Sequence, residues 1–427
     1  MKEPYRITEY GSFITGKEID GYTTLPASTF SALENFILQN NDGDNEALEI
    51  MGLSSRKGIG KIITAKNYVG VITMTDGTSI EILPKVYSSD TYTYEKAKKL
   101  LIDMLKTLKD TTYKSFQTTN VSAEKMNIFE IFIRMYIDEI FFIVKRGLKC
   151  NYETVQSNEN VYKGKILFSK QIKHNFIHKE KSYVEYDVFN VNRAENKLIK
   201  ATLQYLYKTS SSIKNKNDIK TLLHSFTEVE ASLNYQSDFS KVVSDRNMKD
   251  YTFAMLWSKV FLSGKSFTSF SGSEIAVALL FPMETLFESY IAVQLKRLLN
   301  NSDYTVSAQD KTHHLFENPT KFLMKPDIVI KNDSNVFVMD TKWKLLSEAK
   351  ANYGISQADM YQMYAYQKKY SAESVTLLYP MTDKVNAEKA IKYSSLDGAV
   401  VRAKFVDLFN VKESLSAILN DTFLHNS

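Results

Sequence analysis

The chain has 427 residues, of which 44% are hydrophobic, so it can bury more than one core and wholesale disorder is excluded. Its net charge of +5 is compatible with a nucleic-acid partner without indicating one. The single cysteine, Cys150, excludes an intramolecular disulfide, and no Cys/His cluster indicates zinc. Because no apolar run is long enough to span a membrane and the N-terminus lacks a signal-peptide core, we expect a cytosolic protein without a membrane partner.

Residues 1–90 are predicted to form a β-rich domain. Strands are expected at Ile62–Ala65, Tyr68–Met74 and Ser79–Leu83, after a glycine-punctuated turn at Lys57–Lys61. The sequence TDG between the last two strands is a hairpin signal. The turn KGIGK lacks the GxxxxGK[ST] pattern of a phosphate loop, so we expect no NTP-binding site in this chain.

Residues 91–272 are predicted to form a second, mainly helical region. A hydrophobic period typical of helices covers four segments: Thr93–Lys109, Ala123–Lys145, Asn192–Lys208 and Asp250–Leu262. Between them, Tyr162–Lys173 is predicted to return to strand, and Ser210–Lys220 is predicted to be an exposed polar connection. The Ser/Gly-rich segment Ser263–Ser273 has the composition of a linker and places the boundary of a third domain, 273–427.

A basic run lies in the second region. Between Lys163 and Lys181 there are six lysines and two histidines against one acid, Glu180. A solvated surface is the common explanation for such a run. The alternative is contact with a phosphate backbone or a protein partner, which we assign to Lys163, Lys165, Lys170 and Lys173.

The third region shows the order helix, strand, strand, helix, strand, which predicts a mixed α/β (α+β) domain. Its helices are expected at Phe281–Asn300, with Pro282 in the first turn, and at Ser356–Tyr370, with Ser356 as N-cap. Further strands are expected at Ser374–Tyr379 and Ala399–Leu408.

The most informative segment is a predicted hairpin, Phe322–Ile330 and Val336–Trp343, across the turn KNDSN. Asp340 and Lys342 share one face of the second strand, and pairing of the strands would bring Asp327 to the same end. Two carboxylates and an ammonium can hold Mg²⁺ and stabilise a phosphodiester under attack by water. The alternative is a solvated rim with a surface ion pair, which the apolar flanks disfavour because a buried acid needs a partner.

The two flanking helices offer further candidates. Glu284 and Glu288 are four residues apart and share a helical face, where acids can simply complement the helix dipole or add a metal or water contact. Glu288 is slightly favoured, and the choice stays open. Gln362 and Tyr366 also share a face, and they either pack or reach the scissile phosphate or orient Lys342.

Together, Glu288, Pro326-Asp327, Asp340-Thr341-Lys342 and Gln362-x-x-x-Tyr366 resemble the successive motifs of PD-(D/E)xK nucleases with a trailing QxxxY helix. The phrases FPMETLFESY, DTKWK and DMYQMYAY resemble more narrowly the McrC subunit of McrBC-type restriction systems. The phrases AKNYVGVI, IEILPKV, YKGKILFSKQIKHN and AENKLIK extend this resemblance over most of the chain.

The resemblance implies a C-terminal restriction-endonuclease-like domain with a mixed central sheet flanked by helices, in which Asp327 and Asp340 bind Mg²⁺. Glu288 would be an accessory acid, and Lys342 would position or activate the attacking water. The N-terminal region would dock on a McrB-like AAA+ GTPase ring, which binds the GTP and selects the double-stranded DNA target. Arg56, Lys57, Lys85 and Ser210–Lys220 are candidates, from charge and exposure, for stimulating that GTPase.

Three hypotheses follow. The leading one is a Mg²⁺-dependent DNA endonuclease subunit that cuts within a GTP-driven complex. The second is a non-catalytic adaptor that binds the GTPase and DNA, and the third is a stand-alone repair nuclease of the RecB type. Whether the target is methylated, and the stoichiometry of the complex, stay open.

Overall fold

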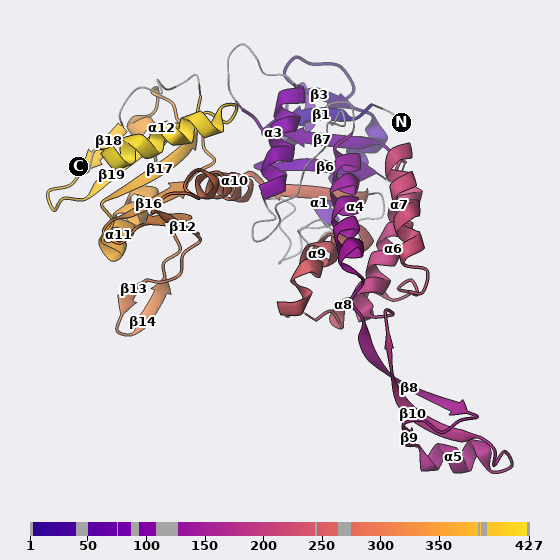
Figure 1. Ribbon diagram of the computed structural model, residues 1–427. Helices are drawn as coiled ribbons and strands as arrows, with labels where there is room; N and C mark the ends of the chain where they lie inside the picture. Colours follow the sequence, from indigo (N-terminus) through magenta and orange to yellow (C-terminus); the bar gives the residue numbers. More distant parts are fainter. Residues whose placement is uncertain are drawn as a thin grey trace. The chain divides into compact units, whose positions relative to one another are not determined.

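The structure is a computed structural model that describes residues 3–39, 50–74, 76–86, 94–107, 127–243, 246–263, 275–382, 385 and 391–424. The fold is mixed α/β, as expected (Figure 1), and the chain divides into two compact units. One unit runs from Asn127 to Ser269, and the other combines Lys2–Met126 with Phe270–Ser427. Across these described ranges, no helix is both long and apolar enough to cross a bilayer.

The second unit begins with two four-stranded sheets. Their strand orders are β1-β7-β6-β11 and β3-β2-β5-β4. The strands are β1 (Tyr5–Thr8), β2 (Ser12–Thr15), β3 (Thr23–Leu25), β4 (Met51–Arg56), β5 (Gly60–Ala65), β6 (Tyr68–Met74), β7 (Ser79–Leu83) and β11 (Ile275–Pro282). With helix α1 (Ala27–Gln39), they enclose one core that includes Phe13, Leu33, Ile63 and Ile82. The strands predicted at β5, β6 and β7 and the turn before β5 are confirmed.

Strand β11 joins this N-terminal core although it lies about 190 residues after β7 in the sequence. It pairs antiparallel with β6, and Leu280 is buried in the core. Gly70 permits this close pairing, because a Cβ atom there would lie 1.9 Å from the Leu279 carbonyl oxygen. The units therefore group residues differently from the expected domains 1–90, 91–272 and 273–427: β11 lies past 272 yet completes the N-terminal sheet.

The unit from Asn127 to Ser269 has a helical body. Its helices are α4 (Ile128–Arg146), α6 (Ala194–Thr209), α7 (Ile213–Ser225), α8 (Tyr235–Ser240) and α9 (Lys249–Ser263). The core is aromatic: Phe132, Trp257 and Phe261 pack ring against ring, and the buried Tyr136 hydroxyl bonds with Ser258 Oγ at 2.8 Å. The predicted helices at α4, α6 and α9 are confirmed, while most of the expected linker Ser263–Ser273 lies outside the described residues.

Helix α7 corrects the expectation of an exposed connection at Ser210–Lys220. Ser212 caps the helix, and Ile219 within the helix is fully buried. The buried carboxylate of Glu130 accepts hydrogen bonds from Ser210 Oγ at 2.8 Å and from Asn215 Nδ2 at 2.8 Å. The polar residues therefore form an internal network that connects α7 to α4. The sequence predicted a loop because the polar composition alone does not show this network.

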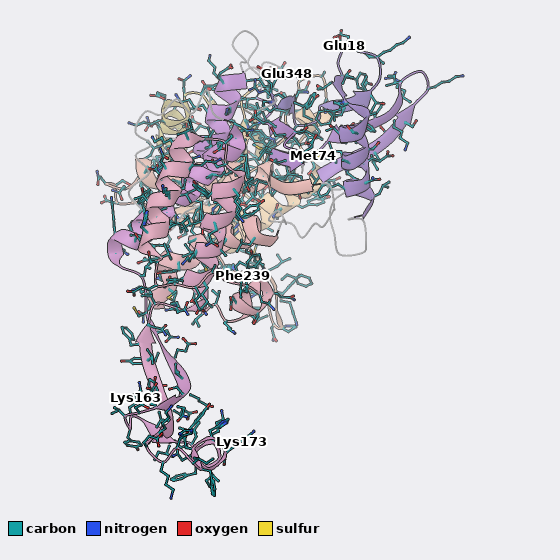
Figure 2. The ribbon with its side chains drawn as sticks, turned by 90° about the vertical axis from the view of Figure 1, so that its right-hand side faces the viewer. Glu18, Met74, Lys163, Lys173, Phe239 and Glu348 are labelled. Carbon is teal, nitrogen blue, oxygen red and sulfur yellow. The ribbon has the colours of Figure 1, made fainter. Side chains whose placement is uncertain are left out.

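A narrow extension, here called the finger (Asn151–Asn190), projects from the helical body of this unit (Figures 1 and 2). Strands β8 (Asn151–Glu159) and β10 (Ser182–Asn190) pair antiparallel along their whole length. The far end carries the two-residue strand β9 (Lys165–Ile166) and helix α5 (Phe168–Asn175). The prediction of strand for Tyr162–Lys173 was therefore wrong for most of the segment. Helix α5 has only eight residues, which are too few to show a helical period clearly in the sequence.

The C-terminal part of the second unit is a six-stranded sheet in the order β12-β15-β16-β17-β19-β18. Its strands are β12 (Thr305–Ala308), β15 (Ile328–Lys331), β16 (Val336–Thr341), β17 (Ser374–Pro380), β18 (Ile391–Ser394) and β19 (Val400–Val406). Strands β16, β17 and β19 run parallel to one another. The predicted hairpin is confirmed as β15 and β16, in which Ile328 pairs with Met339 and Lys331 with Val336.

Helices cover both faces of this sheet. Successive residues of a strand point to opposite faces. Val338 accordingly packs with Met363 of α11 (Gln357–Tyr370), while the Phe337 ring lies 5.2 Å from that of Phe423 in α12 (Val411–Leu424). Helix α10 (Met283–Leu298) contacts β12, β16, α12 and also α3 (Tyr94–Thr107). The helices predicted at α3, α10 and α11, with Ser356 as N-cap of α11, are confirmed.

The first run of the predicted hairpin is split, which corrects the expectation of one strand over Phe322–Ile330. Its first half is β14 (Thr320–Leu323), which pairs with β13 (His314–Glu317), and β15 starts only at Ile328. Pro326 lacks an N–H group and cannot continue a sheet ladder. The break leaves Asp327 at the start of a strand.

Glu9 joins the first sheet to the segment after β16. This carboxylate is 1% exposed and accepts hydrogen bonds from the Lys85 amide at 2.8 Å and from Trp343 Nε1 at 2.9 and 3.0 Å. Burial raises the pKa of Glu9 to about 7, although these bonds act in the opposite direction.

We expect the substitution Glu9→Gln to remove a pH dependence of stability. Because the pKa of Glu9 in the folded chain lies above its ordinary value of 4.5, its contribution to stability is full at low pH and is lost as pH rises toward about 7. Gln keeps an oxygen acceptor and carries no charge. The melting temperature of the variant relative to wild type should therefore be higher at about pH 8 than at about pH 5. An equal difference at both pH values, with the exposed Glu18→Gln as control, would contradict this.

Candidate active site

The acidic and basic residues singled out in the sequence lie where the C-terminal sheet ends. Asp327 directly precedes β15, Asp340 and Thr341 end β16, and Lys342 follows. The Lys342 amide donates to the Leu378 carbonyl at 2.9 Å, so its backbone is still held by β17. In α/β sheets, the carboxyl ends of parallel strands form the usual ligand-binding edge.

Asp340 and Lys342 form a close ion pair. The distance from Lys342 Nζ to Asp340 Oδ2 is 2.6 Å, and the Asp340 carboxylate is only 2% exposed. Burial and the neighbouring Asp327 raise the pKa of Asp340 to about 7, against the opposing effect of Lys342. Burial lowers the pKa of Lys342, but Asp340 outweighs it and the net direction is upward, so the ammonium stays charged.

A further acid, Asp359 on α11, lies 3.9 Å from Lys342 Nζ. The motif pattern did not point to this residue, because it lies in the first turn of a helix, where acids are common for other reasons. Its presence makes Lys342 the shared cation of two carboxylates.

Asp327 is held by the residue between Asp340 and Lys342. Its Oδ2 atom accepts hydrogen bonds from the Thr341 amide and from Thr341 Oγ1, both at 2.7 Å. Two hydrogen bonds to one carboxylate oxygen restrict the movement of that oxygen. Thr341 is therefore a positioning residue that the motif spacing did not reveal.

Glu288 lies within electrostatic range of Asp327. Burial and the charge of Asp327 raise the pKa of Glu288, and Gln309 Nε2 donates to its Oε1 at 2.7 Å. The pKa of Glu284 is also raised by burial, but this side chain bonds with Asn67 of the first sheet. Of the two acids, the geometry couples Glu288 to Asp327.

Gln362 and Tyr366 bond with each other. Gln362 Nε2 donates to the Tyr366 hydroxyl at 2.9 Å, and Tyr366 is buried in the core below α11. Burial, followed by the charge of Asp340, raises the pKa of Tyr366. The tyrosine thus stays a neutral hydroxyl close enough to the acids to sense their charge.

The donor set suits Mg²⁺ better than a transition metal. Within the described ranges, no group of three or more His, Cys, Asp or Glu side chains is arranged as a metal cluster. Mg²⁺ usually binds through one or two carboxylates and keeps several waters. Asp327 and Asp340 repel each other in a buried setting, and a divalent cation would relieve this repulsion, so the residues present fit such an ion.

The lysines of the basic run lie elsewhere. Lys163, Lys165, Lys170 and Lys173 are all in the finger, in the other unit from the carboxylates. Lys163 lies 3.3 Å from Glu159 and over the Tyr186 ring, and Lys170 lies over the Tyr183 ring. These two lysines therefore have structural partners within the finger.

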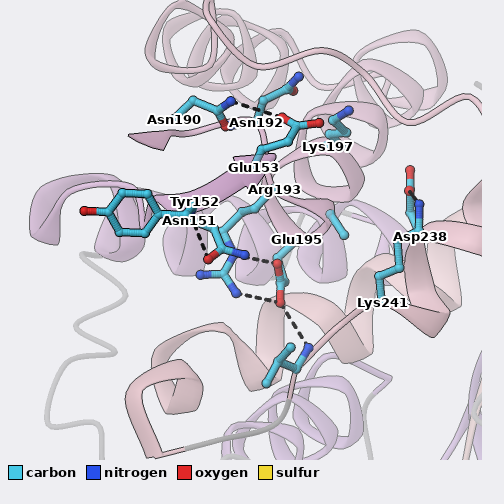
Figure 3. Close-up of a pocket in the computed structure, with 12 residues that line it drawn as sticks. Asn151, Tyr152, Glu153, Asn190, Asn192, Arg193, Glu195, Lys197, Asp238 and Lys241 are labelled. Atoms are coloured by element: carbon cyan, nitrogen blue, oxygen red, sulfur yellow. Dashed lines mark hydrogen bonds and ion pairs between the residues drawn. The ribbon is translucent and has the colours of Figure 1, made fainter. Parts of the chain in front are cut away.

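A pocket of about 220 Å³ opens at the root of the finger (Figure 3). Its lining carries charges of both signs, so the pocket has no preference for an anion or a cation. The charged residues of the lining are Glu153, Arg193, Glu195, Lys197, Asp238 and Lys241. Arg193 and Glu195 form a two-pronged ion pair with N–O distances of 2.6 and 3.0 Å. All the lining residues belong to the unit from Asn127 to Ser269, whereas Asp327, Asp340 and Lys342 belong to the other unit.

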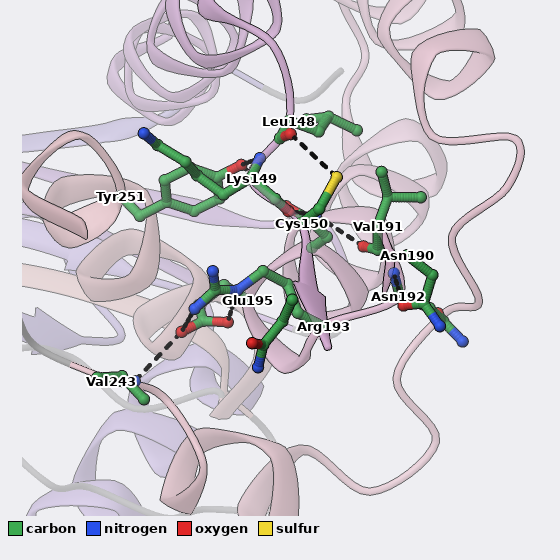
Figure 4. Close-up of polar contacts among 12 residues, drawn as sticks. Leu148, Lys149, Cys150, Asn190, Val191, Asn192, Arg193, Glu195, Val243 and Tyr251 are labelled. Atoms are coloured by element: carbon green, nitrogen blue, oxygen red, sulfur yellow. Dashed lines mark hydrogen bonds and ion pairs between the residues drawn. The ribbon is translucent and has the colours of Figure 1, made fainter. Parts of the chain in front are cut away.

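The same root is held by a polar network (Figure 4). Asn196 Nδ2 donates to the carbonyls of Lys149 and Val191, at 3.0 and 2.8 Å, and these residues flank the two strands of the finger. Tyr251 of α9 donates to Asn196 and accepts from the Lys149 amide, both at 3.0 Å. The network fixes where both strands leave the helical body.

One family model matches more than half of the chain. A family model described as a McrBC 5-methylcytosine restriction system component matches residues 63–380. The fold is similar to a chain in the refined half-complex of Thermococcus gammatolerans McrB AAA+ hexamers with bound McrC, with a TM-score of 0.63, 20% identity, and 97% of this chain and 100% of that chain covered. A chain in the cryo-EM structure of the Thermococcus gammatolerans McrBC complex gives a TM-score of 0.49 at 19% identity, covering 70% and 88%. No curated protein matches the chain.

Proposed function

Because the chain belongs to the family of McrBC 5-methylcytosine restriction system components, we propose that it is the Mg²⁺-dependent DNA endonuclease subunit of such a system. The observation that carries this proposal is the buried Asp340 carboxylate, paired with Lys342 and placed beside Asp327 at the end of a parallel strand. A buried acid next to another acid is costly unless it serves a cation. The domain that holds it would be a PD-(D/E)xK nuclease domain.

Each residue has a role in hydrolysis of a phosphodiester. Asp327 and Asp340 would hold Mg²⁺, with Glu288 as an accessory acid, and the bound ion would supply a Lewis acid and an activated water. Thr341 keeps Asp327 in place, and Lys342 stabilises the negative charge that grows on the phosphate. Water attacks phosphorus directly, without a covalent enzyme intermediate.

Substitution of the ion pair tests the proposal. We expect Asp340→Asn and Lys342→Ala to lower DNA cleavage by about 100-fold or more, because each removes a group that acts on the transition state. Cleavage is measured with the GTPase partner, GTP and Mg²⁺, and stimulation of the GTPase should be unchanged. Asp421→Asn is the matched control, since it breaks another acid–lysine pair of the same unit, with Lys404. Full cleavage by either variant would refute the site, and no cleavage even by wild type would favour the adaptor hypothesis.

Binding of Mg²⁺ can be tested without cleavage. A ligand that binds only the folded chain raises its melting temperature. We therefore expect millimolar Mg²⁺ to raise the melting temperature of the wild-type chain. The substitution Asp327→Asn should abolish most of this response. An unchanged response of the variant would place the ion at other residues.

The finger is proposed to dock on an AAA+ GTPase ring, which would bind the GTP. The Thermococcus gammatolerans structure holds McrC bound to McrB AAA+ hexamers, and its fold resembles that of this chain. The outer end of the finger exposes four large apolar side chains: Phe168, Ile172, Phe176 and Ile177. Exposed apolar clusters of this kind mark protein interaction sites, and the fixed root of the finger holds the cluster at a set position.

We expect the double substitution Phe176→Ser and Ile177→Ser to abolish most of the stimulation of the partner's GTPase. Both side chains are about four-fifths exposed (79% and 84%), so the chain should fold normally, as checked by its melting temperature. Tyr152→Ser, at the exposed root of the finger, is the control. Normal stimulation by the double variant would shift attention to Arg56, Lys57 or Lys85.

A further inference from the structure

The hairpin of β13 and β14 stands out from the C-terminal sheet (Figure 1). Every residue of β14 is exposed, and a two-stranded hairpin has no core of its own. Nevertheless it carries two large aromatic residues, Phe316 and Phe322, which are 54% and 70% exposed. Their rings lie 6.0 Å apart, edge to face. These rings form an apolar patch that buries little within the chain.

The backbone of Phe322 sharpens this point. Its φ angle is +60°, a left-handed conformation that glycine and asparagine adopt readily and that costs energy for a bulky side chain. Since the ring is mostly exposed, packing does not offset this cost. Folding alone would favour Gly or Asn here, so the aromatic ring points to a contact outside the chain.

The base of the hairpin contains Gln309, which bonds with both Asp327 and Glu288. The Gln309 amide donates to the Asp327 carbonyl at 2.8 Å, and the Gln309 side chain donates to Glu288. On the other side, Met324 lies three residues before Asp327, and its amide donates to the His313 carbonyl at 2.9 Å. A ligand that lies along the hairpin therefore starts beside the acids.

Helix α11 braces the hairpin and neutralises one of its acids, Glu317. Tyr370 donates to Asp310 at 2.9 Å, its ring packs edge-on against His313 at 4.4 Å, and Lys369 pairs with Glu317 at 2.7 Å. Three further lysines are exposed on the hairpin and its flanks, namely Lys311, Lys321 and Lys325. Exposed lysines thus lie on and beside the strands that carry the two aromatic rings.

We propose that the β13–β14 hairpin binds the DNA duplex beside the scissile phosphate, with Phe316 and Phe322 in the minor groove and the lysines on the flanking phosphates. This inference rests on the proposed nuclease function. Apolar wedges in the minor groove and lysines on phosphates are the chemistry of proteins that hold DNA by shape rather than sequence. The hairpin accordingly positions the duplex for cutting and leaves the choice of target to other parts of the complex.

Removal of the two rings tests the apolar contact. Phe322→Asn is chosen because Asn tolerates the left-handed backbone, so the variant should be at least as stable as wild type. It is combined with Phe316→Thr, since Thr is favoured in strands. In the full chain with its GTPase partner and GTP, we expect KM for a duplex DNA substrate to rise about tenfold or more, with GTPase stimulation unchanged. Leu396→Asn, an exposed apolar residue in the turn between β18 and β19, is the matched control.

The phosphate contacts have their own signature. Binding of a fluorescent duplex DNA to the same complex is measured at several salt concentrations. Each lysine–phosphate contact contributes about 0.9 to the slope of log affinity against log salt. Lys321→Gln and Lys325→Gln should each lower the slope by about that amount, and Lys392→Gln, on the exposed part of β18, should not.

The outcomes separate this inference from the proposed function. If wild type cleaves DNA but the ring variant has an unchanged KM and the lysine variants an unchanged slope, the hairpin does not bind DNA. If the ring variant loses GTPase stimulation, the hairpin binds the partner protein and the inference is overturned. If wild type binds DNA without cutting it, the nuclease function fails, while the binding measurement still decides the role of the hairpin.

Discussion

The pairing of β11 with β6 is the constraint on which the proposed active site depends. It inserts a strand from the second half of the sequence into the N-terminal sheet, with Gly70 removing the side chain that would block it. Helix α10 begins at the next residue, and the Met283 amide donates to the Asn67 carbonyl at 3.1 Å. The helix start is thereby fixed to the first sheet, and Glu288 lies little more than one turn along it. The bond between Glu9 and Trp343 repeats this link close to Lys342.

The burial of like charges makes the site itself electrostatically unfavourable. Asp340 is buried next to Asp327, and desolvation of an ion is worth on the order of several kcal/mol before its partners compensate it. Lys342 provides part of the compensation, at 2.6 Å, and shares its charge with Asp359. Such a centre is held together by the packing around it, since Val338, Met363 and Tyr366 form a continuous core below α11. The rigid sheet therefore keeps like charges close that would separate in a flexible loop.

Local patterns were enough to predict some of this architecture. The β15–β16 hairpin and the N-cap of α11 follow from neighbouring residues, and so the sequence showed that Asp327, Asp340 and Lys342 converge. The β6–β11 pairing joins segments about 200 residues apart, and no local pattern encodes such a partner. Thr341, Gln309 and Asp359 are ordinary residue types whose roles arise only from what lies beside them. Helix α7 was missed because its polar residues point to Glu130, although the N-cap Ser212 and the apolar pair Ile219 and Leu222 were available signals.

The two tryptophans give the molecule an optical label for each unit. Trp257 is buried among the aromatic rings of the helical body, and Trp343 lies next to Lys342 with its indole N–H held by Glu9. Trp343 also packs edge-on against Phe287 of α10, the helix that carries Glu288. Emission from Trp343, isolated in a chain with Trp257→Phe, therefore comes from the immediate neighbourhood of the acids. The reverse substitution, Trp343→Phe, leaves a reporter of the helical body that carries the finger.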